Sequence, residues 1–440
     1  MTLADRFSYS ENYHNKCTAL LDTAFNHVPV YKAWKGFDPG ANAPLDERFA
    51  ALPALTKEDI RNNFPLGLMP EGQDLQAGLA SEEIEYTFTS GTTSERVVNI
   101  WDQDWWNRSE AAAWKLHSTL AALPYPQKQA KLASSLNVGI CCEEDLPMAQ
   151  RILGDTLYLN EKISLLQWQP RHYRRMVEEL NAYQPVILEA NPSLLARLAY
   201  WIIDNGLSVF SPQAIVFTFE FPSAIHLAAL RRVFSSAFVS SYGSTETGFV
   251  LQQCADGLLH QNTDFCRIDF EPLKPVFGGP ELGRIFVSTF DNPWNCIIRF
   301  DVGDLVRLHP DGQCACPNAG GMIADAIEGR IANVTFGVEG NLVSTKMLDD
   351  ALATVPALRD YHMEQTDRTQ YILRVMLEPD ANTAAAQKNA TDALHAALQT
   401  VYGRDGSYDI QILDTILPGP AGKFRRTQAN FSFDEGGLFQ

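Results

Sequence analysis

Between residues 130 and 245, short and mainly apolar runs alternate with longer segments that have helical spacing. Short apolar runs are typical of buried strands, and longer segments with apolar residues three and four positions apart predict helices. We expect strands at 186–188, 214–217 and 238–240 and helices at 171–181, 193–204 and 223–234. Strands that alternate with helices form a parallel sheet covered by helices on both faces. This region therefore predicts an α/β fold.

The segments on either side of this region have different patterns. Residues 1–80 read as helices and loops, and the Trp- and Ala-rich segment 104–123 predicts another helix. Residues 265–310 are mainly strand-like. The strand candidates lie at 284–289, 296–300 and 305–308. Together these segments predict a large N-terminal domain over residues 1–330, with β-sheets flanked by helices and a small β-rich subdomain.

The pattern changes again after Gly329 and Arg330. The remaining residues predict, in order, a helix at 345–354, a strand pair within 361–377, a helix at 383–402, a strand at 408–413 and a loosely held tail at 430–440. We therefore expect a small, mobile α+β domain over residues 331–440. A chain of 440 residues is long enough for these two domains.

The composition limits the classes of partner. The formal net charge of -18 argues against a nonspecific nucleic-acid binder, which needs a basic surface. We find no apolar run long enough to span a membrane and no N-terminal signal sequence, so we expect no membrane partner. The eight cysteines do not resemble a secreted disulfide framework. These features predict a cytoplasmic protein with reduced thiols, and a homodimer stays open.

Residues 87–93 read Thr-Phe-Thr-Ser-Gly-Thr-Thr, which places several hydroxyl groups around one glycine. Glycine allows backbone angles that let a loop turn its N–H groups toward one anion, and a helix start would favour negative charge there. We expect this loop to precede a helix and to bind a polyphosphate. The Walker sequence is absent, so an ordinary P-loop is excluded. Taken alone, the segment also fits a simple turn.

Further polar segments follow along the chain. Glu246 ends the run Ser-Tyr-Gly-Ser-Thr-Glu after a strand, where a carboxylate near hydroxyls suits Mg²⁺. Asp304 follows a glycine at a predicted strand end and could accept hydrogen bonds from ribose hydroxyls. Arg330 could pair with a phosphate, and Lys423, on a Gly- and Pro-rich loop, could neutralise a reacting phosphate. Each segment alone also fits an ordinary turn or a solvated charge.

The order of these segments resembles the adenylate-forming superfamily of acyl-CoA synthetases, adenylation domains and luciferases. The resemblance is strongest to its phenylacetate–CoA ligase-like branch and covers about residues 85–425. The matching segments are Thr89-Ser90-Gly91-Thr92-Thr93, Tyr242-Gly243-Ser244-Thr245-Glu246, residues 297–305, Gly329-Arg330 and Gly422-Lys423. The resemblance implies an AMP-forming acid–thiol ligase with ATP, Mg²⁺ and coenzyme A as reaction partners.

The resemblance also implies a role for each matching residue. The β- and γ-phosphates would contact Ser90, Gly91, Thr92 and Thr93, and adenine would lie beside Glu220 and Phe221. The adenine and acyl regions would be lined by Tyr242, Gly243 and Ser244, and the α-phosphate and Mg²⁺ would face Thr245 and Glu246. Ribose would bind Asp304 near Arg330, and Lys423 would approach the reacting carboxylate. The catalytic residues would therefore be Lys423, Glu246 and Thr245.

The acyl pocket is expected to include Asn137, Val138, Phe219, Tyr242 and Gly243. Their apolar and aromatic neighbours favour an aryl or arylalkyl carboxylic acid, although such residues also fill ordinary cores. The acyl group would pass to coenzyme A. Alternatives are a carrier-protein phosphopantetheine thiol, an amine, or an inactive protein of the same fold that only binds nucleotide.

Several positions depart from the family pattern. Ser94 replaces the last glycine of the loop, Val97 a common lysine, and Asp301 a common arginine. Asn333 and its neighbour Ala332 stand where an acidic hinge residue is usual. These departures bear on loop closure and domain rotation and keep the inactive alternative open, but they leave Glu246, Asp304 and Lys423 in place.

A separate set of residues suggests a metal. Cys314 and Cys316 have C-x-C spacing, and Cys254 and His260 lie earlier in the chain. Thiolate and imidazole ligands suit tetrahedral zinc, and a site with four protein ligands leaves no open position for catalysis. We therefore expect a structural Zn²⁺, as in the branch that the chain resembles, with Cys266 as a possible replacement ligand. The alternative is that these residues are unrelated.

Overall fold

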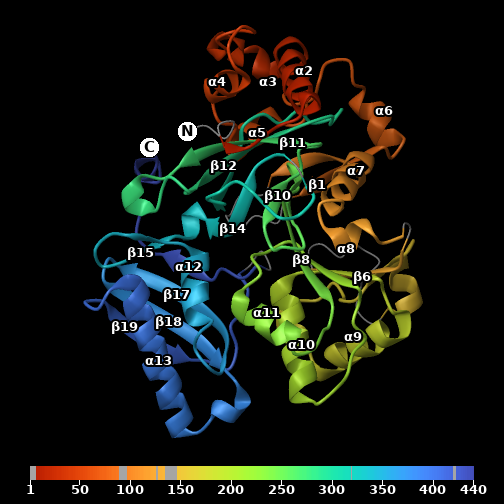
Figure 1. Ribbon diagram of the computed structural model, residues 1–440. Coiled ribbons are helices and arrows are strands. Elements are labelled where there is room, and N and C mark those ends of the chain that lie inside the picture. Colours follow the sequence, from red (N-terminus) through yellow and green to blue (C-terminus); the bar gives the residue numbers. More distant parts are fainter. Residues whose placement is uncertain (1–5, 89–96, 125–126, 134–145, 319, 420–422) are drawn as a thin grey trace. The chain divides into compact units, whose positions relative to one another are not determined.

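The computed structural model describes residues 6–88, 97–124, 127–133, 146–318, 320–419 and 423–440. The chain forms two compact units. The first contains residues 1–122, 241–273 and 280–326, and the second contains residues 123–240, 274–279 and 327–440. Both are mixed α/β structures, as the sequence predicts (Figure 1). The proposed domain boundary at residue 330 stays a prediction.

The first unit begins with a group of helices. They are α2 (Glu11–His27), α3 (Pro29–Lys32), α4 (Leu45–Ala50), α5 (Lys57–Asn63) and α6 (Leu75–Ala80). Ser10 caps α2 by accepting the backbone N–H of Tyr13, and Thr56 and Asp59 form a capping box at α5. These short polar side chains satisfy N–H groups that have no partner within the helix, which explains where the helices begin.

The described residues on either side of 89–96 form a pair of strands. Strand β1 (Ile84–Phe88) pairs antiparallel with β2 (Val98–Asp102), with Phe88 opposite Val98. Helix α7 (Gln103–Trp114) begins only after β2, capped by Asp102, and a short helix α8 (Ser118–Ala121) follows. The expected direct passage from the loop into a helix is therefore wrong, because a strand intervenes and the 104–123 helix is broken at residues 115–117.

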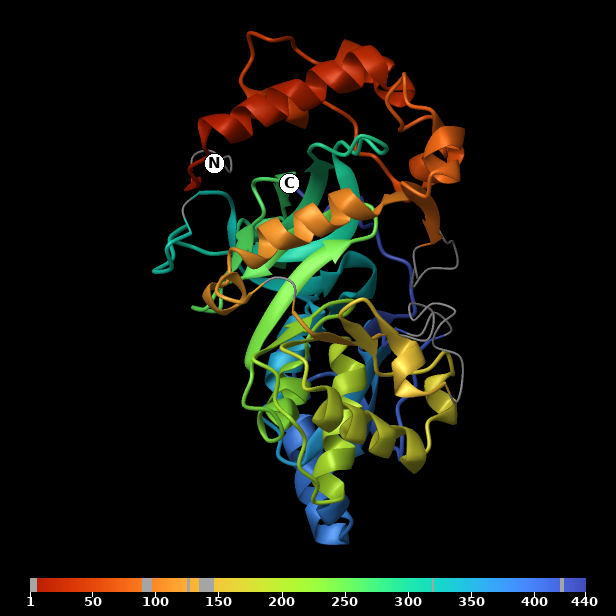
Figure 2. The same ribbon diagram turned by 90° about the vertical axis from the view of Figure 1, so that its right-hand side faces the viewer.

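The sheet of the first unit is largely antiparallel. Its order is β11 (Cys266–Pro272), β12 (Leu282–Thr289), β13 (Phe300–Leu308), β14 (Ile323–Arg330), β10 (Leu259–Gln261), β9 (Gly248–Gln253) and β8 (Ala237–Ser244). Helix α7 packs on β9, where Ser109 accepts the N–H of Phe249 (Figure 2). The predicted strand at 296–300 is wrong: only Phe300 belongs to a strand, and Tyr31 bonds the backbone of Cys296 and Ile298 instead.

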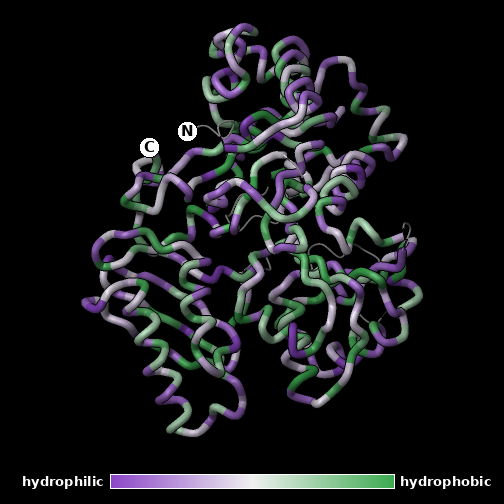
Figure 3. Tube along the Cα trace, in the orientation of Figure 1, coloured by the Kyte–Doolittle hydropathy of each residue, from purple (hydrophilic) through white to green (hydrophobic). Residues whose placement is uncertain are grey.

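The second unit contains the predicted parallel sheet. Strands β8, β7 (Ala214–Phe217), β6 (Ile187–Ala190), β3 (Gln129–Leu132) and β5 (Thr156–Tyr158) run parallel, and β4 (Ile152–Leu153) adds an antiparallel edge. Its helices are α9 (Pro170–Tyr183), α10 (Pro192–Asp204) and α11 (Ala224–Arg231). Alternate residues of the strands form one apolar core with these helices (Figure 3).

The rest of the second unit is an α+β structure with its own core. Its sheet has the order β19 (Ser407–Ile412), β18 (Gln370–Leu377), β17 (Leu358–Asp367) and β20 (Thr427–Ala429). Helices α12 (Thr345–Leu352) and α13 (Ala384–Tyr402) share its apolar core. The expected loose tail is wrong, because Leu438 and Phe439 are buried and Leu438 accepts the N–H of Lys274.

The fold class is thus confirmed: helices flank a large mixed sheet, and a smaller sheet lies near the C-terminus. Among the helices of the described residues, none combines the length and apolar character needed to cross a bilayer.

Candidate functional site

The structure joins two of the predicted nucleotide-binding residues in the first unit. The hydroxyl of Tyr242 on β8 donates a hydrogen bond to Asp304 Oδ2 on β13 at 2.9 Å. Asp304 lies in mid-strand, not at the expected strand end. It follows Gly303, which has a positive φ of 76° and lies opposite a register shift between Arg284 and Phe286. A bulge at a glycine re-aims the next side chain, and this geometry gives Asp304 its direction.

The predicted magnesium ligand lies in a tight hairpin. Strand β8 ends at Ser244 and β9 begins at Gly248, so Thr245 and Glu246 occupy the turn between two strands. The hydroxyls of Ser244 and Thr247 bond each other at 2.9 Å, and Glu246 is buried. The local environment of Glu246 is therefore a turn between two strands.

Gly243 stands where the two strands of this hairpin approach closely. A Cβ atom there would lie 2.0 Å from the carbonyl oxygen of Gly248. No real side chain tolerates such a contact with backbone, so this position requires glycine. The close approach of Gly243 to Gly248 brings the polar residues on both sides of the turn together.

Glu220 and Phe221 lie in the second unit, in the loop after β7. Glu220 Oε1 accepts the backbone N–H of Phe424 at 3.0 Å, and its Oε2 accepts the hydroxyl of Ser193 at 2.8 Å. Burial raises the pKa of Glu220, and these two donors oppose the rise. Glu220 therefore contacts the residue that directly follows Lys423, although Glu220 and Lys423 are far apart in sequence.

Phe219, expected in the acyl pocket, has a positive φ of 73°. That backbone conformation is strained for a bulky residue and is found preferentially at functional sites. A charged pair lies beside it: Lys131 Nζ is 2.8 Å from Glu189, and the same ammonium lies 6.0 Å from the centre of the Phe219 ring. Thr218 donates a further hydrogen bond to Glu189. These charges add polarity to a region that the sequence predicts as apolar.

Arg330 ends strand β14 in the second unit. The preceding Gly329 has a positive φ of 105°, and a Cβ atom there would lie 2.9 Å from Thr345 Cβ. Glu328 accepts a hydrogen bond from Ser344, the residue that caps α12. The Gly-Arg pair therefore sits where β14 meets the start of α12.

Some predicted site residues lie outside the described part of the chain. They are Ser90, Gly91, Thr92, Thr93, Asn137 and Val138. Of the others, Tyr242, Gly243, Ser244, Thr245, Glu246 and Asp304 belong to the first unit, and Phe219, Glu220, Phe221, Arg330 and Lys423 to the second. The nucleotide and acyl roles of these residues remain predictions.

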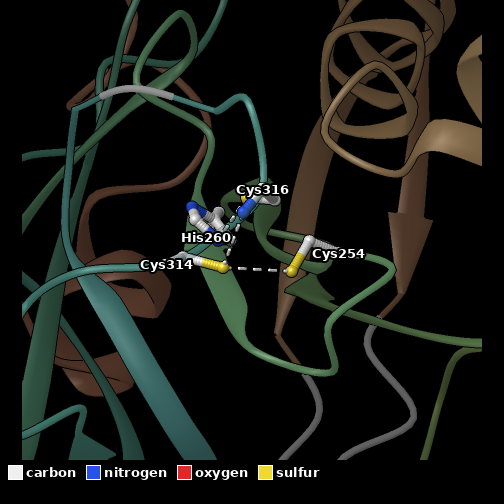
Figure 4. A group of neighbouring side chains, drawn as sticks. All are labelled: Cys254, His260, Cys314 and Cys316. Atoms are coloured by element: carbon white, nitrogen blue, oxygen red, sulfur yellow. Dashed lines mark hydrogen bonds between the residues drawn. The ribbon is translucent and has the colours of Figure 1, made fainter.

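The four predicted metal ligands converge in the first unit (Figure 4). Their ligand atoms all lie within 4.8 Å of one another. Cys254 Sγ and Cys314 Sγ are 3.7 Å apart, and Cys316 Sγ is 3.3 Å from His260 Nε2. Tetrahedral zinc with Zn–S bonds of about 2.3 Å places its sulfurs about 3.8 Å apart. The distance between Cys254 Sγ and Cys314 Sγ therefore matches that of two sulfurs on one zinc ion.

The chemistry of these ligands also fits. Burial raises the pKa of Cys254, raises that of Cys316 to about 12, and lowers the pKa of His260. A neutral imidazole is ready to bind a metal, whereas the thiols must lose protons that a bound cation displaces. His260 Nδ1 is buried without a hydrogen-bond partner in the described structure, although a metal-binding histidine usually donates this N–H to an acceptor.

Cys266, the possible replacement ligand, is not part of this group. It is buried, and its thiol donates to the carbonyl oxygens of Asn262 and Val250. Burial raises its pKa well above the usual value, which disfavours the thiolate. We therefore exclude it as an alternative to the other three cysteines.

Sequence reasoning missed the polar groups that contact the segment after Lys423. Ser193, Asp360 and His226 contact the guanidinium of Arg426, three residues after Lys423, and none of these three partners belongs to a recognised motif. Asn191 caps α10 just before Ser193, a local signal that places Ser193 at the start of a helix. No local signal links that helix start to a segment more than two hundred residues later.

Comparisons with known proteins support the fold. Protein CapK of Staphylococcus aureus is 22% identical over 386 residues, which cover 85% of this chain and 78% of CapK. The structure of 2-hydroxyisobutyryl-CoA ligase, solved in the postadenylation state with R3-HIB-AMP, matches with a TM-score of 0.72 at 18% identity. The match covers 98% of this chain and 90% of the ligase.

A second solved structure shares the fold at greater distance. The amide bond synthetase McbA from Marinactinospora thermotolerans matches with a TM-score of 0.51 and 14% identity, over 93% of this chain and 92% of McbA. No protein-family model matches the sequence. The chain therefore has the fold found in adenylate-forming enzymes.

Proposed function

We propose that this protein activates a carboxylic acid with MgATP and transfers the resulting acyl group to coenzyme A. The main support is the fold, which the chain shares over 98% of its length with a CoA ligase solved with an acyl-adenylate. The ordered polar segments support the same proposal, because each carries the residue type that one part of MgATP requires.

In the proposed first step, a carboxylate oxygen of the acid attacks the α-phosphorus of ATP. The bond to the β-phosphate breaks, and pyrophosphate leaves with its electron pair. Such a reaction needs alignment and neutralisation of charge more than a protein nucleophile. Lys423 would neutralise the reacting oxygens, Glu246 with Thr245 would hold Mg²⁺ near the α-phosphate, and Asp304 with Tyr242 would hold the ribose.

In the proposed second step, the thiol of coenzyme A attacks the acyl carbon and AMP leaves. A small domain that turns between the two steps would let one site serve both, as conformational steps do in many enzymes. The acid stays an aryl or arylalkyl one in this proposal. The Lys131–Glu189 pair beside Phe219 makes acids with an additional polar group worth including in any screen.

The test is a pyrophosphate-release screen across carboxylic acids, with and without coenzyme A. We expect release that depends on one group of acids, and thioester formation when coenzyme A is added. The variant Lys423→Ala should lower adenylation by more than about tenfold while ATP still binds. Release by no acid, or release that Lys423→Ala leaves unchanged, would contradict the proposal.

The fold is compatible with more than one acyl acceptor. McbA, an amide bond synthetase, shares the fold, so the fold is compatible with an amine as well as a thiol. A phosphopantetheine thiol on a carrier protein is a further candidate. Parallel assays with coenzyme A, phosphopantetheine and simple amines separate them, because all three acceptors follow the same pyrophosphate release. A protein that binds ATP without releasing pyrophosphate would instead be the inactive nucleotide binder.

We also propose that the Cys254, His260, Cys314 and Cys316 group holds a structural Zn²⁺. With four protein ligands it would have no open position for substrate. Bound zinc would tie the loop that carries Cys314 and Cys316 to the ends of β9 and β10. Metal analysis of the purified protein tests this directly.

A further inference from the structure

The segment that carries Lys423 is held at several points in the second unit. Arg197 on α10 donates to the carbonyl oxygen of Ile416 and lies 5.0 Å from the ring centre of Phe424. The N–H of Gly419 donates to the carbonyl oxygen of Lys423 at 2.9 Å. Together these contacts hold the described residues before and after residues 420–422.

The hydrogen bond from Phe424 N–H to Glu220 Oε1 holds the peptide group that follows Lys423. Glu220 cannot swing freely, because the Ser193 hydroxyl bonds its other oxygen and Ser193 lies at the capped start of α10. A carboxylate held at both oxygens places the peptide between Lys423 and Phe424 in one position. The direction in which the lysine side chain leaves the backbone is set by that peptide.

A buried charge network extends this hold beyond Phe424. Arg426 donates to Asp360 Oδ1 at 2.8 Å, and Asp360 lies 3.3 Å from His226 Nε2 on α11. The same guanidinium reaches Ser193 Oγ at 3.3 Å. Ser193 thus joins both contacts, so Phe424 and Arg426 are bound through one continuous set of polar groups.

We propose that Glu220 is a positioning residue for Lys423: by holding the Phe424 backbone it fixes where the lysine lies during adenylation. This inference rests on the proposed function of Lys423. It differs from the role that the family resemblance implies for Glu220, which is to border adenine. The two roles predict different results when Glu220 and Lys423 are changed together.

The test is a double-mutant cycle read by pyrophosphate release and by ATP-dependent exchange of labelled pyrophosphate. Glu220→Ala should lower kcat about tenfold or more, since a small misplacement of a reacting group has effects of that size. In a Lys423→Ala background the same change should cost less than about twofold, because there is no lysine left to position. Glu220→Gln keeps an acceptor for the Phe424 N–H and should restore most of the rate.

An equal loss in both backgrounds would overturn the proposal and assign Glu220 to the nucleotide itself. A rise of KM for ATP with kcat unchanged would do the same. Glu178→Ala on α9 is the matched control, because it removes an exposed carboxylate from the same unit. Thermal unfolding of each variant shows whether the change has altered the fold as a whole.

A second measurement does not depend on any catalysis, so it separates this inference from the proposed function. Trypsin cleaves after Lys423, and the bond to Phe424 is the one that Glu220 holds. We expect Glu220→Ala to be cut there at least about tenfold faster than the wild type under native conditions. The variants Glu220→Gln and Glu178→Ala should match the wild type. Equal cleavage of Glu220→Ala and the wild type would refute the claim that Glu220 fixes the backbone at Phe424, whatever reaction the protein catalyses.

Discussion

The change Asp360→Asn tests how strongly the buried charge network stabilises the second unit. Asp360 and Arg426 are each 5% exposed and are joined by a hydrogen bond of 2.8 Å. Burial alone would raise the pKa of Asp360, but Arg426 and His226 hold it well below its usual range. The carboxylate is therefore charged at neutral pH, and asparagine removes that charge with little change in shape.

Loss of one partner from a buried ion pair typically costs about 3–5 kcal/mol, because the other charge is left without compensation. Arg426 keeps its charge in the variant, because a guanidinium stays protonated in proteins and the remaining charge of Asp349 also raises its pKa. Asp349 remains close by, bonded to Ser223 and to the N–H of Ala224. Because this second carboxylate offsets part of the loss, we expect the lower end of the range, about 3 kcal/mol.

Urea unfolding followed by circular dichroism and tryptophan fluorescence measures this change. A loss of about 3 kcal/mol corresponds to a midpoint lower by about 1 M for a typical dependence on urea. The double variant Asp360→Asn/Arg426→Met should recover more than half of the loss, because no uncompensated charge remains. A midpoint shift below about 0.3 M for Asp360→Asn, or no recovery in the double variant, would refute the reasoning.

Three further predictions follow from other groups. Burial, and then the charge of Arg426, lower the pKa of His226. Below about pH 6.5 the unfolded chain binds a proton at this histidine that the folded chain does not, so the free energy of unfolding should fall as the pH drops from 7 to 5. The variant His226→Gln should reduce the slope of this free energy against pH by up to about 1.4 kcal/mol per pH unit. Titration of unfolding against pH measures this, and an unchanged slope would contradict it. The purified protein should contain about one zinc per chain, and Cys314→Ser should lose it together with thermal stability; elemental analysis that finds equal zinc in both proteins would exclude the site. Tyr242→Phe removes the hydrogen bond to Asp304 and should raise KM for ATP several-fold while kcat changes little, whereas a large loss of kcat would place Tyr242 in the chemical step.

The elements that local sequence determines were predictable. Strand 214–217 was expected from four consecutive apolar residues, and the structure has β7 over the same residues, all of them buried. Helix α10 begins where Asn191 caps it and Pro192 opens it, which are signals that the sequence displays. Burial and capping act over a few neighbouring residues, so a pattern within ten or fifteen residues is sufficient.

The misses arose where distant residues decide. Residues 296–298 are apolar enough for a strand, but the backbone of Cys296 and of Ile298 bonds the hydroxyl of Tyr31, and only Ile297 bonds the neighbouring strand β12. The tail was expected to be loose, yet Leu438 and Phe439 are buried. No strand was expected between the loop and the helix at 104–123, because the pairing of β2 with β1 depends on tertiary contacts that composition does not reveal.

The candidate metal group shows the opposite case. Cys254 and Cys316 are far apart in sequence, but their chemistry is rare enough to predict that they meet, and they do. The contact between Glu220 and Phe424 has no such signal, because one of its partners is a backbone N–H that every residue except proline carries. Side-chain chemistry can therefore be inferred from sequence, whereas the backbone contacts that aim it require coordinates.

The close approach at Gly243 has a consequence for redesign. The space there admits a hydrogen atom and nothing larger, since the next strand's carbonyl oxygen occupies the volume of a methyl group. A library that randomises this hairpin to change substrate preference should keep Gly243 constant and diversify the residues around it. Any side chain at that one position would push the two strands apart and would add no new contact with a substrate.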